Sequence, residues 1–259
     1  MERLSQHTET PRGLSANALR LWGYFCVLLG IAAKGIIQNG MLGLESMTNQ
    51  QIFDVMNQSE GAMVMVTTSL ALQLLESCGV PIFAFLLVEG FQKTSSFKHY
   101  LIRVGLVALV SEIPYNLTFH SQIIAMDSRN PVFGLVLGLL VLYFYHYLRE
   151  KSLRNTLIKF CVTVAAVLWC EMLCIEHGTF TIIMTAAIWL MRGKPNFRTL
   201  VACGAAACGT IISLFYLAAP FSAITLHFYN GEKGETNRVF NLICYPLMLL
   251  VAAIAVYYL

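Results

Sequence analysis

Four ionisable side chains interrupt the apolar stretches of this sequence and are the first candidates for chemistry. They are Lys34, Glu89, Glu112 and Glu171. A charge at the centre of a membrane-spanning helix costs about 2.5–3.5 kcal/mol on insertion scales, so such residues usually mark a functional site or a buried pair. We therefore expect these four side chains to face polar groups inside a helix bundle.

The residues that follow Glu112 favour a polar cavity. Pro114 cannot donate a backbone hydrogen bond, whereas Tyr115 and Asn116 offer hydrogen-bonding side chains to a ligand. Irregular backbone at membrane depth is tolerated where it lines protein or water. We predict a catalytic role for Glu112, and we assign Tyr115 and Asn116 to substrate binding.

Lys34 and Glu171 are the expected partners of Glu112 in a cavity that opens to the outer side of the membrane, and we assign both to substrate binding. Alternatively, Lys34 and Glu112 form a structural ion pair that locks two helices together. Glu89 lies near the inner face. An ion pair with Lys93, one helical turn further on, competes there with a role in substrate binding.

A further candidate is the outer turn at Glu176, His177 and Gly178. An imidazole titrates near neutral pH, so His177 can serve as a general base, and Glu176 can orient it or act itself. The alternative is a structural loop histidine. The sequence has no metal-ligand spacing and no Gly-rich phosphate loop, so we predict no metal site.

The composition places these residues in a membrane protein. Of 259 residues, 57% are hydrophobic and 12% are charged, whereas soluble domains have roughly 45–50% and about 25%. The net charge of +3 is small and is spread between the apolar stretches, which argues against binding to nucleic acid. We predict an all-α, polytopic helix bundle in contact with membrane lipid. Its oligomeric state does not follow from the sequence.

Eight apolar stretches approach the length of about 20 residues that crosses a hydrocarbon core, although two of them are short. The predicted spans are 19–38, 79–91, 100–119, 132–148, 156–175, 179–191, 200–219 and 239–258. Residues 62–75 are interpreted as an interfacial or partly buried helix that runs into the second span, and the alternative is a ninth span. Residues 1–18 are predicted to be a disordered cytoplasmic tail, and residues 19–259 a single transmembrane domain.

The loop charges favour this topology. Lysine and arginine are frequent before the first span and rare in 39–79, and this alternation continues to the C-terminus. Cytoplasmic loops carry an excess of these residues, so eight spans with both termini in the cytoplasm fit the pattern. On this topology Ser95 lies on the cytoplasmic side of the cell membrane, whereas Asn49 and Gly231 lie on its outer side.

Several sequence blocks resemble the TraX family of membrane proteins. They are PIFAFLLVEGFQKT, HYLIRVGLVALVSEIPYNLTF, NPVFGLVLGLL, and FYNGEKG followed by YPLMLL. The resemblance implies a multi-helix protein related to membrane acyltransferases, with acetyl-CoA or another acyl-CoA as the donor. It also implies a pilin-like peptide or a surface glycan as the acceptor. Asn130 and Tyr245 lie in these blocks and are assigned to substrate binding.

The chain departs from the family pattern where a base is expected. The family usually has a histidine near the end of its first span, where this chain has Lys34. A second family histidine, in the last span, corresponds to Met248. The middle motif of the family, usually an aspartate, a tyrosine and a glycine, corresponds to Glu176, His177 and Gly178. Acyl transfer to an amine or hydroxyl needs a base, so His177 is the candidate to replace the two histidines.

Three functions remain open. The first is an acyltransferase, with acetyl transfer to a peptide terminus or a cell-surface substrate. The second is a family member without catalysis that serves as a binding or assembly subunit, and the replaced histidines separate it from the first. The third is a small transporter with a pathway lined by Lys34, Glu112 and Glu171, against which the lack of an internal repeat argues.

Overall fold

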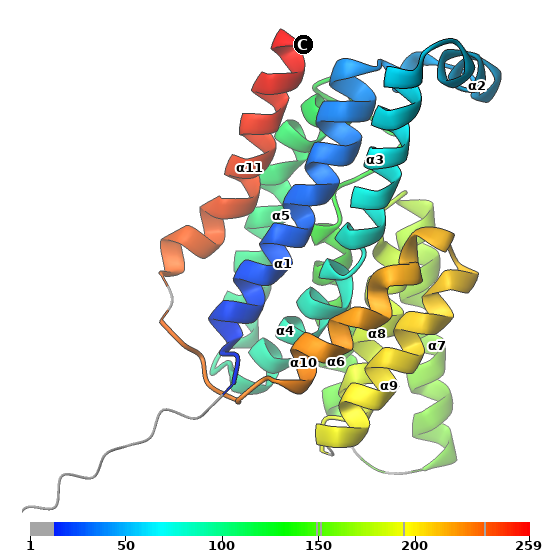
Figure 1. The fold of residues 1–259 in the computed structure, drawn as a ribbon. Helices are drawn as coiled ribbons and strands as arrows, with labels where there is room; N and C mark the ends of the chain where they lie inside the picture. The colour runs from blue at the N-terminus through cyan, green and yellow to red at the C-terminus, as the bar shows by residue number, and fades with distance from the viewer. Residues whose placement is uncertain (1–12, 149, 151, 194, 236) are drawn as a thin grey trace, which may run out of the picture.

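The structure is a computed structural model, and it describes residues 13–148, 150, 152–193, 195–235 and 237–259. These residues form a bundle of helices without a β-strand among them (Figure 1), which confirms the predicted all-α fold. In chain order, the elements are α1 (Ala16–Gly30), η1 (Ile31–Met41), η2 (Leu44–Ser46), α2 (Asn49–Gln58), α3 (Glu60–Glu76), α4 (Gly79–Lys93), α5 (Phe97–His120), α6 (Val132–Tyr147), α7 (Leu153–Met172), α8 (Gly178–Leu190), α9 (Pro195–Cys208), η3 (Gly209–Ile211), η4 (Leu214–Phe221), α10 (Ser222–His227) and α11 (Arg238–Tyr258).

We call the end of the bundle at which α1 begins the lower end, and the end at which α11 finishes the upper end, as drawn in Figure 1. Several helical segments are long and apolar enough to cross a membrane. They are Ala16–Met41, Glu60–Lys93, Phe97–His120, Leu153–Met172 and Val239–Tyr258. Large apolar side chains such as Leu109 and Phe160 are exposed on them, as expected for surfaces in contact with lipid. The chain is therefore a helical membrane protein.

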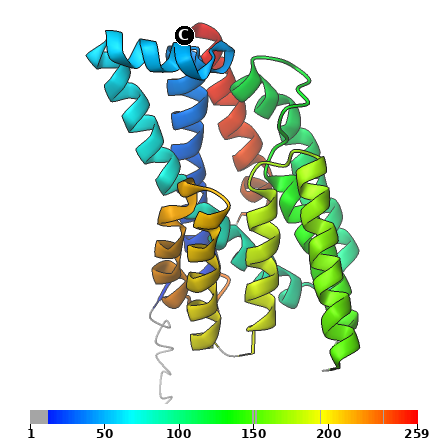
Figure 2. The ribbon, with the colours of Figure 1, turned by 90° about the vertical axis from the view of Figure 1, so that its right-hand side faces the viewer.

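The chain path alternates between the two ends. Helix α1 and η1 rise together, α3 and α4 descend, α5 rises, α6 descends, α7 rises and α8 descends (Figures 1 and 2). Helix α11 rises again beside η1 and α5. A Cβ atom added at Gly40, which lies at the end of η1, would come within 3.1 Å of Leu259, so both lie at the upper end.

Helices α3 and α4 form one broken crossing. The predicted interfacial helix at 62–75 is α3, and it makes the upper half of a segment whose lower half is α4. The helix that lies across the upper end is instead α2, seen at the top of Figure 2. The break falls at Ser77 and Cys78, where the Ser77 hydroxyl donates back to the Leu74 carbonyl at 2.7 Å. Glu76 stands at this break.

The predicted span at 200–219 is wrong, because the chain reverses within it. Helix α9 and η3 rise from the lower end, Ser213 adopts an extended conformation with φ −156°, and η4 and α10 return downward. The Ser213 hydroxyl accepts a hydrogen bond from the backbone N–H of Phe215 at 3.3 Å and so begins η4. The residues on both sides of the turn are apolar, so hydropathy alone could not detect the reversal.

This hairpin changes the topology of everything that follows it. Gly231 lies at the lower end, where its carbonyl accepts a hydrogen bond from Lys93 at 2.7 Å, and Ala16 N–H donates to the Glu232 carbonyl at 2.8 Å. The prediction that Gly231 lies on the side opposite the N-terminus is therefore wrong, because it lies at the end where α1 begins. Ala16 and Leu259 lie at opposite ends of the bundle, which contradicts the placement of both chain ends on one side. Lys233 joins the basic lower end, so the positive-inside rule now predicts that end in the cytoplasm.

The centre of the bundle is built around α8. This short helix is apolar on all sides and is buried by α4, α6, α7 and α9, as expected for a helix without a solvent face. Its buried side chains, including Ile182 and Ile188, pack against Val88 and Leu139. A second cluster joins α5 to α11 through Tyr115 and Leu249. These contacts hold the beginning of α8, and thus His177, at a defined depth.

The predicted tail at 1–18 falls largely outside the described residues, which begin at Gly13. Leu14 bridges to Tyr229, and the Ser15 hydroxyl accepts a hydrogen bond from the Ala18 N–H at 3.2 Å as the N-cap of α1. The transmembrane bundle therefore includes the last few residues of the segment predicted as a tail.

Candidate functional site

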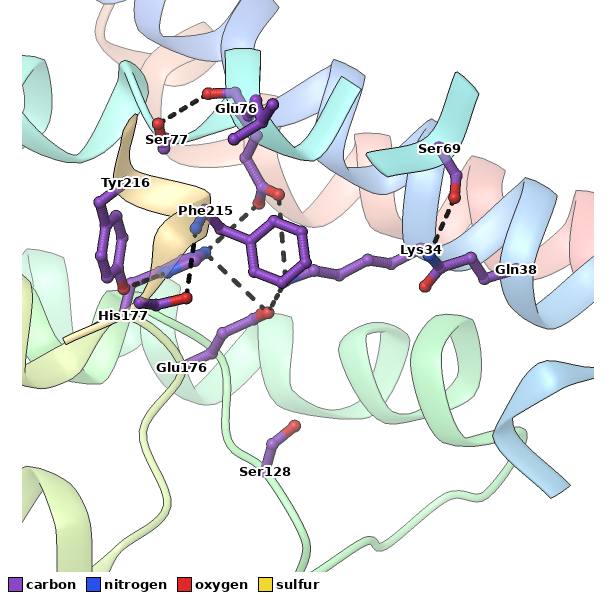
Figure 3. Close-up of polar contacts among 12 residues, drawn as sticks. Lys34, Gln38, Ser69, Glu76, Ser77, Ser128, Glu176, His177, Phe215 and Tyr216 are labelled. Atoms are coloured by element: carbon purple, nitrogen blue, oxygen red, sulfur yellow. Dashed lines mark hydrogen bonds and ion pairs between the residues drawn. The ribbon is translucent and has the colours of Figure 1, made fainter. Parts of the chain in front are cut away.

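A cluster of ionisable side chains lies where four separate segments meet inside the bundle. It contains Lys34 from η1, Glu76 from the end of α3, Glu176 and His177 from the turn between α7 and α8, and Tyr216 from η4 (Figure 3). Lys34 forms an ion pair with Glu176, and its Nζ atom lies 3.9 Å from Glu76 Oε2. The cluster therefore places two carboxylates beside one ammonium group.

Local backbone features bring Lys34 and Glu76 together. Lys34 belongs to η1, a π-helix, and such wide turns often occur at functional sites. The Glu76 carboxyl group lies against Gly30, the last residue of α1 and about one helical turn before Lys34. An added Cβ atom at Gly30 would overlap this carboxyl group. Only glycine leaves room for this approach, so Gly30 is part of the construction of the site.

His177 is held in an unusual backbone conformation. Its φ of 56° lies in the left-handed region, which non-glycine residues rarely adopt. The ring Nδ1 lies 2.7 Å from the Tyr216 hydroxyl. The Nε2 atom lies 3.6 Å from Glu76 Oε1 and 4.0 Å from Glu176 Oε1, and it is buried without a hydrogen-bond partner among the described residues. A ring nitrogen without a partner can accept a proton from a bound molecule.

A cavity of about 600 Å³ leads from the lower end to this cluster. Its mouth is basic and polar, with Arg20, Lys93, Arg103 and Lys233 among the lining residues. Its middle section is apolar and aromatic. Its inner end is lined by Glu76, Tyr115, Glu176, His177 and Tyr245. The predicted cavity that opens to the outer side is thus replaced by one with its mouth at the lower end.

A smaller cavity of about 190 Å³ lies on another side of the cluster. Lys34, Gln73, Ser77, Phe215 and Tyr216 are among its lining residues, so it lies between α3 and the turn of the hairpin. Glu76 and His177 line both cavities. Two molecules bound in the two cavities would therefore meet at His177.

The structure separates Glu112 from the cluster. The Glu112 carboxylate lies 3.4 Å from Arg129 Nη1 and accepts hydrogen bonds from Asn130 Nδ2 at 2.6 Å and from the Asn130 backbone N–H at 3.3 Å. The side chain of Asn130 also donates to the Ala108 carbonyl at 2.9 Å. The predicted Lys34–Glu112 pair is therefore wrong, and both Glu112 and Asn130 fasten the loop at 121–131 to α5.

Three other predicted substrate-binding residues also have partners outside the cluster. Asn116 is buried and donates to the Ile123 carbonyl at 3.2 Å. Glu171 accepts a hydrogen bond from Thr179. Glu89 pairs with Lys93 at 3.2 Å, as the structural alternative predicted, and with Arg198 at 2.9 Å. These contacts join neighbouring segments of the bundle.

The sequence identified part of the cluster and missed the rest. Lys34, Glu176 and His177 belong to it, and Tyr115 donates a hydrogen bond to Glu176 Oε2 at 2.9 Å. Tyr245 lines the inner end of the larger cavity. Glu76 and Tyr216 were missed. An acid that interrupts an apolar run was a usable signal for Glu76, whereas Tyr216 lies in an apolar stretch without any such mark.

One comparison with known proteins decides the family. A family model described as TraX protein matches residues 44–256. The chain belongs to the TraX family. This membership supports a membrane-associated role related to conjugal transfer. No curated protein and no solved structure matches the chain.

The matched TraX region contains every cluster residue except Lys34. The two positions at which the resemblance implies histidines, Lys34 and Met248, are linked through Glu176 and Tyr115. Lys34 pairs with Glu176, and Tyr115 joins Glu176 to a second group of side chains in which Met248 packs. The resemblance implies two histidines and a tyrosine at the positions that Lys34, Met248 and His177 occupy in this chain, and Met248 lies outside the cluster.

Proposed function

We propose that this TraX chain is a membrane acyltransferase that takes an acyl group, in the simplest case acetyl, from acyl-CoA. The observation that carries the proposal is the cavity with a basic mouth at the lower end and His177 at its inner end. Acyl-CoA has phosphate groups at one end and a thioester at the other, and its charge pattern matches this cavity. Basic side chains at the mouth would bind the phosphates.

His177 is the proposed general base. Its Nε2 would accept the proton of the attacking amine or hydroxyl and deliver it to the sulfur that leaves with CoA. Tyr216 would hold the Nδ1 side of the ring, so that Nε2 keeps a free lone pair facing the cavity. The Lys34 ammonium would offset the negative charge that develops on the carbonyl oxygen. Glu76 and Glu176 position Lys34 for this role.

The smaller cavity is the proposed entry for the acceptor. It reaches His177 from the side of α3 and η4, whereas the larger cavity reaches it from the lower end. An amine or hydroxyl in the smaller cavity and a thioester in the larger one would lie on either side of the Nε2 atom. A pilin-like peptide terminus or a surface glycan supplies such a group.

The proposal is tested by acetyl-CoA binding to the purified protein in detergent. Arg103 lines the mouth and is exposed, so Arg103→Gln should weaken binding and reduce its dependence on salt, because one charge-assisted contact is removed. Arg154→Gln is the matched control, since Arg154 is an exposed arginine at the lower end that does not line either cavity. Equal affinity in both variants, or no binding by the unaltered protein, would overturn the proposal.

A second candidate is a binding or assembly subunit without catalysis. It is favoured by the replacement of the two implied histidines by Lys34 and Met248. The two candidates differ in a transfer assay with a short peptide bearing a free N-terminus and with labelled acetyl-CoA. Binding of acetyl-CoA without transfer to any amine or hydroxyl acceptor would favour the second candidate.

A further inference from the structure

A continuous series of hydrogen bonds runs from the upper end of the bundle to Glu176. His120 Nδ1 lies 2.7 Å from Glu45 Oε1, and His120 Nε2 lies 2.8 Å from the Ser128 hydroxyl. The Ser128 hydroxyl lies 2.8 Å from the Tyr115 hydroxyl, which donates to Glu176 Oε2 at 2.9 Å. Four consecutive contacts within hydrogen-bond distance thus join the partly exposed Glu45 to the buried cluster.

The direction of these hydrogen bonds follows from the chemistry of the groups. An ionised carboxylate only accepts, so Tyr115 must donate to Glu176, and the Tyr115 oxygen then accepts from Ser128. The Ser128 oxygen in turn accepts from His120 Nε2. His120 Nδ1 faces the Glu45 carboxylate, so it also carries a proton. With both carboxylates ionised, these directions require a proton on each ring nitrogen of His120. Nδ1 then donates outward to Glu45, and the hydrogen bonds that begin at Nε2 all point inward to Glu176.

Glu176 connects this series to the larger cavity. One of its carboxylate oxygens binds Lys34, while the other accepts from Tyr115. Glu176, Tyr115 and His177 all line the inner end of the cavity, which opens at the lower end. The Lys34 ammonium group should not repel a proton on this route, because the carboxylates of Glu76 and Glu176 both lie within ion-pair distance and balance its charge.

We propose that Glu45, His120, Ser128 and Tyr115 form a proton path from the upper end to Glu176, and that the larger cavity continues this path to the lower end. His120 passes its Nε2 proton to Ser128, Ser128 passes its own to Tyr115, and Tyr115 passes its own to Glu176. Glu176 then releases one proton to water or to His177 in the cavity. Solvent at the upper end restores the imidazolium, and the two hydroxyl groups rotate back to their first orientation.

The path gives this protein an activity that does not depend on an acyl donor. Hydroxyl, imidazole and carboxyl groups in contact are the components of proton relays in membrane proteins. Tyr115 is the narrowest element of the path, because its side chain is 1% exposed and its hydroxyl alone links Ser128 to Glu176. Removal of that one oxygen should interrupt the path.

The test measures proton flux into vesicles that contain the purified protein, a pH-sensitive dye and an imposed potassium diffusion potential. The unaltered protein should carry protons faster than protein-free vesicles, and Tyr115→Phe should return the flux to the protein-free level. Tyr143→Phe is the matched control, since the Tyr143 hydroxyl accepts a hydrogen bond from the neighbouring Tyr147 hydroxyl at 3.2 Å and is not part of the proposed path. It should retain the full flux.

Ser128→Ala provides a second interruption in case Tyr115→Phe does not fold. Ser128 lies in a loop, outside the packed helices, so its loss should spare the fold and abolish the flux. Flux equal to that of protein-free vesicles in the unaltered protein, or unchanged flux in both variants, would overturn the inference. Since no acyl-CoA is present, protons can be carried by a protein that does not bind acetyl-CoA, and the two proposals fail separately.

Discussion

Lys34 and Glu176 are 142 positions apart in the chain, yet they form an ion pair at the centre of the bundle. The pair joins η1 to the turn between α7 and α8, directly beside the histidine that starts α8. Each partner has a further contact, Lys34 with Glu76 and Glu176 with Tyr115. A charge in this mostly buried position is stable only with its partner, so the pair couples the fold to the candidate site.

The Lys34–Glu176 pair should be visible in a double-mutant cycle. Lys34→Met and Glu176→Gln should each lower the free energy of unfolding by about 3–5 kcal/mol, because each leaves the other charge without its partner. The double variant should lose less than the sum of the two losses. Thermal or denaturant unfolding of the protein in detergent measures these values.

Lys34→Met combined with Glu112→Gln is the matched control for this cycle. Glu112 binds Arg129 and Asn130 instead of Lys34, so the losses of these two variants should add. Additive losses for Lys34 and Glu176, together with a coupled result for Lys34 and Glu112, would contradict the observed pairing.

His177→Gln should reduce acyl transfer by about 10²–10⁴-fold, because a positioned general base contributes a factor of this size. The melting temperature should fall only modestly, since the substitution removes one hydrogen bond, between His177 Nδ1 and the Tyr216 hydroxyl, while Nε2 has no hydrogen-bond partner among the described residues. Steady-state transfer from labelled acetyl-CoA measures the effect. His227→Gln, at an exposed position at the end of α10, should leave transfer unchanged. Comparable rates for His177→Gln and the unaltered protein would remove His177 as the base.

Gly30→Ala should displace the Glu76 carboxyl group, because the new methyl group would overlap it. The loss of the Glu76 contacts with Lys34 and His177 should destabilise the protein by about 1–3 kcal/mol and alter binding in the larger cavity. Gly204→Ala is the control, since a Cβ atom there meets no other atom within 4 Å and alanine favours the helix. Unfolding measurements that rank the two variants equally would contradict the close approach of α1 and α3.

Single-cysteine labelling tests the direction of the chain after the α9–α10 hairpin. In a variant without the native cysteines, labels at Ser95 and Gly231 should react from the same side of the membrane, because both positions lie at the lower end. A label at Asn49 should react from the opposite side. If Gly231 labels together with Asn49, the segment at 200–219 crosses the membrane and the hairpin is absent.

The sequence by itself determined the membrane environment, the all-α fold and most of the helices. These features depend on apolar composition and on the length of each apolar run, which are local properties. It also marked Lys34, Glu176 and His177 as costly or reactive groups in an apolar chain. The acid at position 112 was equally conspicuous, but the sequence could not show that its partners are Arg129 and Asn130.

Only the tertiary structure decided which charges meet and where the chain turns. The pairing of Lys34 with Glu176, and the approach of Glu76 and Tyr216, depend on how four segments distant in sequence pack together. The reversal at Ser213 lies within an uninterrupted apolar stretch, so hydropathy is the same for a hairpin as for a crossing. Hydrophobicity sets which segments leave water. Close packing and the pairing of buried charges then set the direction and the partners of these segments. An arrangement that leaves a buried charge unpaired is too costly to compete.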